Sequence, residues 1–369
     1  MKRSTPWIHS SGLDLGFILA PPFVVLLLVV LFPRSFGPEA TLTEVHWLVL
    51  VLLIDVAHVY STIYRTYLDK EAVRHYRFEL VWLPLIAYVL LVLLYSLDPL
   101  WFWRCMAYFA IFHFVRQQYG FMRLYARRDV LPNWKHRLDA VTIYSATLVP
   151  LIFWHLSYPR DFDWFVEGDM IGGDHPMLAR VVLWIYAALL MCFVMSEVIS
   201  FHRSVPFNVP KNILLLGTAL SWFMGIVLYN GDVTFTLFNV VGHGVPYMAL
   251  VWAFGRKKST GGPDPSTAPS WWMRSLFSVR AVPLYLGLLF VLAYLEEGFW
   301  NTLVWDEHRS IFKPFNSLPT LSGHVWLSFL VPLLALPQVA HYIIDAFIWR
   351  MRIDRDQWQG VVFGREIGK

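Results

Sequence analysis

Long apolar segments are the feature of this chain that most constrains its fold. A run of about 20 predominantly apolar residues is long enough to cross a bilayer as a helix, and such runs recur along most of the sequence. Hydrophobic residues make up 57% of the chain and charged residues only 15%, against roughly 25% charged in ordinary soluble domains. We therefore predict an all-α, polytopic transmembrane helix bundle that forms a single integral membrane domain over residues 1–369.

About ten segments satisfy this length criterion. The first lacks a small-residue cleavage site and is long for the apolar part of a signal peptide, so we count it as an uncleaved span. Prolines inside several segments are tolerated, because neighbouring helices can satisfy the backbone groups that proline leaves free. The predicted spans are 13–32, 45–65, 78–96, 99–120, 138–157, 177–200, 210–229, 232–254, 281–297 and 323–349.

The connecting segments predict an orientation. If the N-terminus lies in the cytoplasm, most of the 30 lysines and arginines fall in cytoplasmic segments, as the positive-inside rule requires. Both termini are then cytoplasmic, and the longer external loops are 158–176 and 298–322. Residues 255–280 form a cytoplasmic loop that we expect to be flexible, since they include STGGPDPSTAPS. We expect the protein in the cell membrane, namely a bacterial inner membrane.

Four histidines lie deep inside predicted spans, and each has a polar residue one helical turn away. Spacings of three and four residues place two side chains on the same face of a helix. Ionisable side chains within lipid are costly and usually functional, so these positions predict an intramembrane site. The four motifs are Asp55 with His58, His113 with Gln117, Asn239 with His243, and His341 with Asp345.

The four histidines also share a depth. At about 1.5 Å per residue, each lies roughly 10 to 20 Å along its helix from the next cytoplasmic arginine. Imidazole and carboxylate groups are ordinary ligands of zinc and iron, and helix bundles build such sites from inward-facing side chains. We therefore predict a transition-metal site, with iron or zinc as the cofactor. Its predicted ligands are Asp55, His58, His113, His243, His341 and Asp345.

Neighbouring polar residues complete the predicted site. Gln117 and Asn239 can orient imidazoles through the ring nitrogen that does not face the metal. Arg116 can bind an anionic group of a substrate or lipid, pair with a buried carboxylate, or extend to the cytoplasmic interface. We predict Arg116 and Gln117 as catalytic residues.

More than one function fits these residues. The first is a metal-dependent membrane enzyme, an oxidoreductase rather than a hydrolase, that acts on a lipid-like, hydrophobic or amphiphilic small molecule among the membrane lipids. The second is a proton-coupled transporter that uses the same histidines and aspartates as a relay. Haem ligation by pairs of the histidines and a structural role in a larger assembly also remain open.

Several classes lack sequence support. The chain contains no HExxH, no G-x-S-x-G and no Walker A motif, which argues against zincin proteases, serine hydrolases of that type and P-loop transporters. No internal repeat suggests an inverted-repeat transporter. The two cysteines, Cys105 and Cys192, lie in apolar segments and imply no disulfide framework. No aromatic-interleaved basic surface predicts a nucleic-acid partner.

Overall fold

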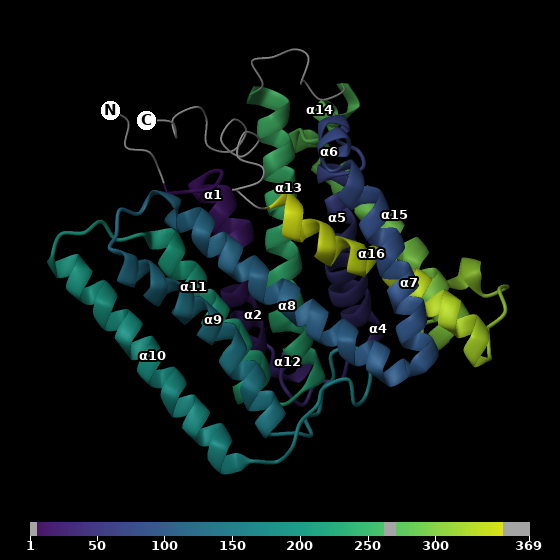
Figure 1. Cartoon of the computed structure of the whole chain (residues 1–369), viewed down its shortest axis with the longest axis horizontal. Coiled ribbons are helices and arrows are strands. Elements are labelled where there is room, and N and C mark those ends of the chain that lie inside the picture. The colour runs from purple at the N-terminus through teal and green to yellow at the C-terminus, as the bar shows by residue number, and fades with distance from the viewer. Residues whose placement is uncertain (1–5, 262–270, 350–369) are drawn as a thin grey trace. The chain divides into compact units, whose positions relative to one another are not determined.

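The computed structural model describes residues 6–261 and 271–349, and every regular element within them is a helix (Figure 1). The predicted all-α class is confirmed. Within these described ranges, eight helices are long and apolar enough to cross a membrane, which supports an integral membrane protein. They are Glu44–Arg65, Arg77–Leu97, Asn133–Leu156, Pro176–His202, Val209–Leu228, Asp232–Thr260, Val279–Trp305 and His324–Ile348.

The predicted count of ten spans is not confirmed. The first predicted span consists of two helices, Ser11–Leu19 and Pro21–Leu31, which meet at an angle of 51°. The break falls at Pro21, since proline has no amide hydrogen to continue the helical hydrogen bonding. The fourth predicted span lies in helix α8 (Pro99–Tyr125), which is long but carries Arg104 and Arg116 and is not among the eight. Its crossing of the membrane stays a prediction, as does the orientation of the termini.

The chain forms two compact units. The first unit comprises Met1–Leu42 and Ala107–Pro246, and the second comprises Thr43–Met106 and Tyr247–Lys369. The chain passes from one unit to the other within two continuous helices. The boundary between Met106 and Ala107 lies in α8, and the boundary between Pro246 and Tyr247 lies in α13 (Gly242–Gly261). The single integral domain expected from the sequence stays a prediction.

In the first unit, three long helices pack together, and two of them border an aromatic core. Helix α10 lies along α9, and α11 packs against α9 and α2 (Figure 1). Phe114, Trp154, Phe162, Trp222 and Phe235 fill the centre, because large apolar side chains gain most by mutual contact. The elements of this unit besides α8 are α1 (Ser11–Leu13), η1 (Asp14–Leu19), α2 (Pro21–Leu31), α3 (Pro33–Phe36), η3 (Ala126–Arg128), α9 (Asn133–Leu156), α10 (Pro176–His202), α11 (Val209–Trp222), η4 (Phe223–Leu228), α12 (Asp232–Thr236) and η5 (Leu237–Val241).

Buried charges connect the same three helices. Lys211 on α11 donates to Asp139 on α9 at 2.9 Å, and both side chains are 1% exposed. Lys135 on α9 lies 3.0 Å from Glu197 on α10. Charges this far from water persist only when they are paired, so these ion pairs fix how α9, α10 and α11 pack.

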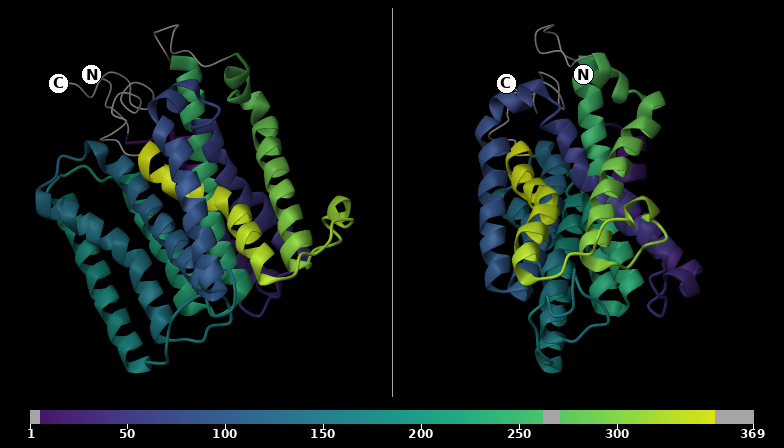
Figure 2. Two further views of the ribbon diagram at one scale, coloured as in Figure 1. Left: turned by 45° about the vertical axis from the view of Figure 1, so that its right-hand side comes forward. Right: turned by 90° about the vertical axis from the view of Figure 1, so that its right-hand side faces the viewer.

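In the second unit, helix α16 lies against α7, and α5 contacts both α15 and α16 (Figure 2). Tyr64, Tyr247, Phe277, Tyr285 and Leu289 belong to its core. The elements are α4 (Glu44–His46), η2 (Trp47–Val56), α5 (Ala57–Arg65), α6 (Lys70–His75), α7 (Arg77–Leu97), α14 (Trp271–Leu276), η7 (Val279–Ala281), α15 (Val282–Trp300), η8 (Asn301–Trp305), η9 (Lys313–Phe315) and α16 (His324–Ile348).

Three segments were predicted as loops. Residues 158–176 are largely irregular, while 298–322 begin with the end of α15 and the short helix η8. Within 255–280, α13 runs to Gly261 and α14 begins at Trp271. The intervening residues, 262–270, lie outside the described residues, so the flexibility of this loop stays a prediction.

Candidate metal centre

The first unit contains one pair of the predicted histidines. His113 comes from α8 and His243 from the first turn of α13, and their ring centroids lie 5.1 Å apart with an interplanar angle of 80°. The His243 ring also stacks on Phe114, with centroids 3.6 Å apart. His113 is 7% exposed and His243 is 1% exposed. Packing against aromatic rings therefore fixes the plane of His243 and keeps the pair away from solvent.

Two glutamines of α8 secure the backbone beside His243. Gln117 donates to the carbonyl oxygen of His243 at 3.0 Å, and Gln118 donates to that of Gly242 at 3.4 Å. Thr218 on α11 donates to Gln118 at 2.9 Å. Gln117 thus contacts the backbone of His243, whereas the sequence predicted that it would contact an imidazole. Gln118 was missed, because it is offset from His113 by five residues and does not share its face in an α-helix.

Asn239 does not contact His243 in the way that an α-helical turn predicts. It lies in η5, a π-helical segment, and donates to the carbonyl oxygen of Phe235 at 2.9 Å. A π-helix bonds residue i to residue i+5 and therefore has a wider turn. Asn239 and His243 nevertheless line the same small cavity of the first unit.

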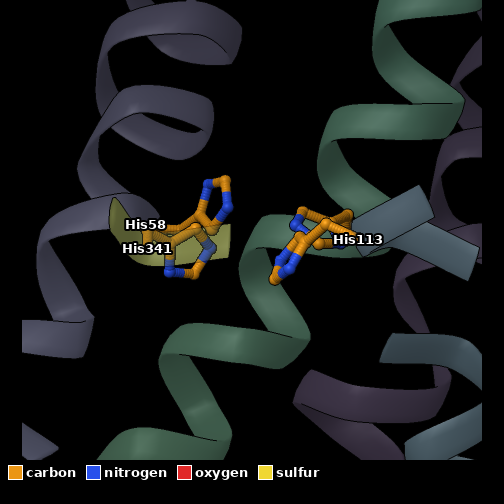
Figure 3. A group of neighbouring side chains, drawn as sticks. His58, His113 and His341 are labelled. Carbon is orange, nitrogen blue, oxygen red and sulfur yellow. The ribbon is translucent and has the colours of Figure 1, made fainter. Parts of the chain in front are cut away.

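The second unit contains the other pair. His58 lies on α5 and His341 on α16, with ring centroids 5.1 Å apart and an interplanar angle of 81° (Figure 3). His58 is 1% exposed and His341 is 2% exposed. The Tyr247 ring packs edge-on against both imidazoles, at 5.9 Å and 5.0 Å between centroids. This pair has almost the same internal geometry as the pair in the first unit.

His341 is supported by a hydrogen-bonded network in the second unit. Thr62 Oγ1 lies 2.7 Å from His341 Nδ1 and 2.8 Å from the hydroxyl of Tyr247. Tyr247 donates to Asp345 at 2.6 Å, and Thr62 lies 3.3 Å from the same carboxylate oxygen. Asp345 is 3.6 Å from His341 Nδ1. Asp345, the predicted partner of His341, is therefore connected to the imidazole mainly through hydrogen bonds with Thr62 and Tyr247.

His58 has a carboxylate and a carbonyl beside it. Its Nδ1 lies 3.3 Å from the carbonyl oxygen of Ile54 and 3.7 Å from a carboxylate oxygen of Asp55. Because a carbonyl oxygen only accepts, the hydrogen bond to Ile54 requires a proton on Nδ1. The same requirement leaves the lone pair of a neutral His58 on Nε2.

Two acidic residues of α15 were missed by the sequence analysis. Glu296 accepts a hydrogen bond from Tyr60 at 2.5 Å, and Glu297 follows it in the same apolar helix. The signal was present in LEEGFW, where two adjacent carboxylates interrupt an apolar run within a predicted span.

His58, His113, His243 and His341 each offer one ring nitrogen, and these four nitrogens lie within 4.8 Å of one another. All four side chains are buried. Among the described residues, no other group of histidine, cysteine or acidic side chains meets the same criterion. A cluster of this kind can hold a metal ion. Asp55 and Asp345 lie beside it but outside the group of four.

Arg116 lies elsewhere. Its side chain is exposed, donates to the hydroxyl of Tyr144 at 2.5 Å and lies over the ring of Tyr119 at 5.1 Å. The structure does not bring it to the four histidines, although it is only three residues from His113.

Comparisons with known proteins do not extend this description. No protein-family model matches the chain, and searches of curated proteins and of solved structures find no match.

Proposed function

We propose that this membrane protein holds one transition-metal ion on His58, His113, His243 and His341. The single observation that carries the proposal is the meeting of four buried ring nitrogens within 4.8 Å. Bonds of about 2.0–2.1 Å in a tetrahedron would place ligand nitrogens roughly 3.3–3.4 Å apart. Side-chain rotations that shift the nitrogens by about an ångström would therefore bring them to bonding distance.

The proton count in the second unit supports this role for His341. The contacts of His341 with Thr62, of Thr62 with Tyr247 and of Tyr247 with Asp345 need three protons. A carboxylate only accepts, and each hydroxyl supplies one proton. When Asp345 is ionised, the third proton lies on His341 Nδ1, which leaves the Nε2 lone pair for a metal. His58 is in the same state, since its Nδ1 donates to the carbonyl of Ile54.

The carboxylates have a supporting role in this proposal. Four neutral imidazoles do not compensate the charge of a divalent cation, and a cation within a bilayer needs compensation. Asp55 lies 3.7 Å from His58, and Asp345 lies 3.6 Å from His341. Carboxylates behind metal-binding imidazoles also orient the rings and make them better ligands.

The donor set favours an ion over haem. Imidazole ligands suit iron, zinc, copper and nickel, and iron or zinc remains our assignment. A haem iron takes two axial imidazoles, whereas four ring nitrogens lie within 4.8 Å of one another here, so an ion that binds all four uses the whole cluster. When bound, a redox-active ion supplies electron transfer, and a zinc ion supplies polarisation of a bound group.

We assign the chain to the membrane oxidoreductases that act on a lipid-like substrate. The support is the burial of the four histidines in a chain whose helices are apolar enough to cross a membrane. In this assignment the two pairs bind the ion, the Thr62–Asp345 network holds a proton on His341 Nδ1, and the aromatic packing excludes water.

Elemental analysis of the purified protein, combined with an absorption spectrum, tests the proposal. We expect close to one iron or zinc ion per chain and no Soret band. The His58→Ala and His243→Ala variants should each lose the ion while remaining folded by circular dichroism. Absence of stoichiometric metal from active protein would refute the proposal, and a Soret band would replace it with haem binding.

A proton-coupled transporter is the second candidate. The observation that favours it is the continuous chain of short hydrogen bonds from His341 through Thr62 and Tyr247 to Asp345. In that case Asp345→Asn would abolish proton-coupled counterflow in proteoliposomes, and metal removal would leave transport intact. Transport activity that survives Asp345→Asn would remove this candidate.

A further inference from the structure

A small polar cavity lies beside His243 in the first unit. It measures about 20 Å³, and its lining includes Gln118, Thr218, Ser221, Asn239 and His243 among apolar side chains. A single water needs roughly 10–15 Å³ on this measure. The cavity therefore has room for one water and excludes any organic substrate.

Two side chains that line this cavity have polar atoms without a hydrogen-bond partner among the described residues. They are the hydroxyl oxygen of Ser221 and the amide oxygen of Asn239. Ser221 is 4% exposed and Asn239 is 5% exposed, so bulk solvent does not reach them. A buried polar atom without a hydrogen-bond partner destabilises the folded protein, and a water that bonds to both atoms would remove most of that cost.

Other polar groups of the cavity lining already form hydrogen bonds within the protein. Thr218 lies within hydrogen-bonding distance of Gln118 and of its own helix, and Gln118 donates to Gly242. The amide nitrogen of Asn239 donates to Phe235. The lining contains no carboxylate, which makes it a poor site for a cation. A water molecule, with two donors and two acceptors, fits a hydroxyl beside an amide oxygen.

We infer that this cavity holds one ordered water that bridges Ser221 and Asn239 and positions His243. The positioning role rests on the proposed metal centre, whereas the presence of the water does not. Imidazoles that bind metals usually have a polar partner behind them. Thr62 fills that role directly for His341. Asn239, which lines the same cavity as His243, fills it for His243 through the water.

A high-resolution structure of the wild type and of Ser221→Val tests the inference, together with metal affinity measured by competition with a chromogenic chelator. We expect density for one water in the wild type and none in Ser221→Val, since the added methyl groups fill the cavity and remove the hydroxyl. Metal affinity should fall by about 10–100-fold in Ser221→Val, as for other losses of outer-shell partners.

Two further variants separate the outcomes. Asn239→Leu should reproduce the loss of affinity. Ser328→Ala, which removes a buried serine bonded only to its own helix, should leave affinity within about twofold. An empty cavity in the wild type would overturn the inference, and a water whose loss leaves affinity unchanged would overturn its role at His243. If the wild type binds no metal, the proposed function fails, and the density still decides whether the water is present.

Discussion

At the scale of single residues, the second unit shows how one threonine organises a buried imidazole. Thr62 contacts His341, Tyr247 and Asp345 at once, although it carries one hydroxyl. Its position four residues after His58 places both on one face of α5. The identities of these residues were readable in the sequence, but the contacts between α5, α13 and α16 were not.

His341→Ala should remove the proposed metal. Loss of one of four ligands should weaken binding by more than the 10–100-fold that is typical for outer-shell partners, as measured by metal content after dialysis. His324→Ala is the matched control, because His324 begins the same helix but is exposed and bonds to the carbonyl of Ser96. Equal metal content in the two variants would contradict the assignment of His341.

Thr62→Val should weaken metal binding by about 10–100-fold, since valine has the shape of threonine without the hydroxyl that accepts from His341. Thr62→Ser should retain most of the affinity. Thr142→Val serves as the control, because Thr142 is also buried but bonds only to its own helix. The test is a chelator competition, and wild-type affinity in Thr62→Val would exclude a role for the network.

At the scale of helices, the structure departs from the sequence prediction where a helix is irregular. Every predicted span lies on helices, because the backbone N–H and C=O groups of a continuous apolar run must form hydrogen bonds within the run itself. The break at Pro21 changed the direction of the helix axis, and η5 placed Asn239 in a π-helical turn, yet neither changed hydropathy. Hydropathy therefore locates an apolar helix but does not show where it bends or changes its hydrogen bonding.

Lys211→Met should destabilise the first unit strongly. It leaves Asp139 as a buried carboxylate without its closest cation, and breaking such a pair costs about 3–5 kcal/mol. The measurement is the midpoint of thermal unfolding in detergent. The double variant Lys211→Met with Asp139→Leu should recover much of this loss, because no charge of the pair then remains buried. A double variant no more stable than the single one would indicate that other partners of Lys211 dominate.

At the scale of the whole molecule, each compact unit contains one pair of buried histidines. The two pairs share a centroid separation of 5.1 Å and nearly perpendicular rings. This pairing of residues that are remote in sequence supports a functional role for the four histidines more strongly than their shared depth in the predicted spans does.

Metal retention should depend on pH in one direction. A protonated imidazole cannot bind a metal, so acidification should release the ion. We expect stable retention at pH 8 and progressive loss towards pH 5, measured by dialysis and elemental analysis, with metal binding restored when the pH is raised again. Retention that does not change between these limits would argue against imidazole ligands.

The predicted topology can be tested independently of the metal. Reporter fusions at the C-terminus and within 262–270 should report the cytoplasm, and insertions at 158–176 and 298–322 should report the opposite side. This follows from the distribution of lysine and arginine between alternate segments. A cytoplasmic signal from either external loop would show that the number of crossings before it is wrong.

The sequence by itself determined the helical membrane architecture and the four histidines, because hydropathy and helical rise are local properties of consecutive residues. Tertiary structure alone decided which groups meet: Thr62 and Tyr247 with His341, Gln117 with a backbone carbonyl, and Arg116 with Tyr144. These contacts depend on how each helix is rotated and packed against its neighbours. That rotation is set by many small contacts between remote segments, and no single stretch of sequence records it.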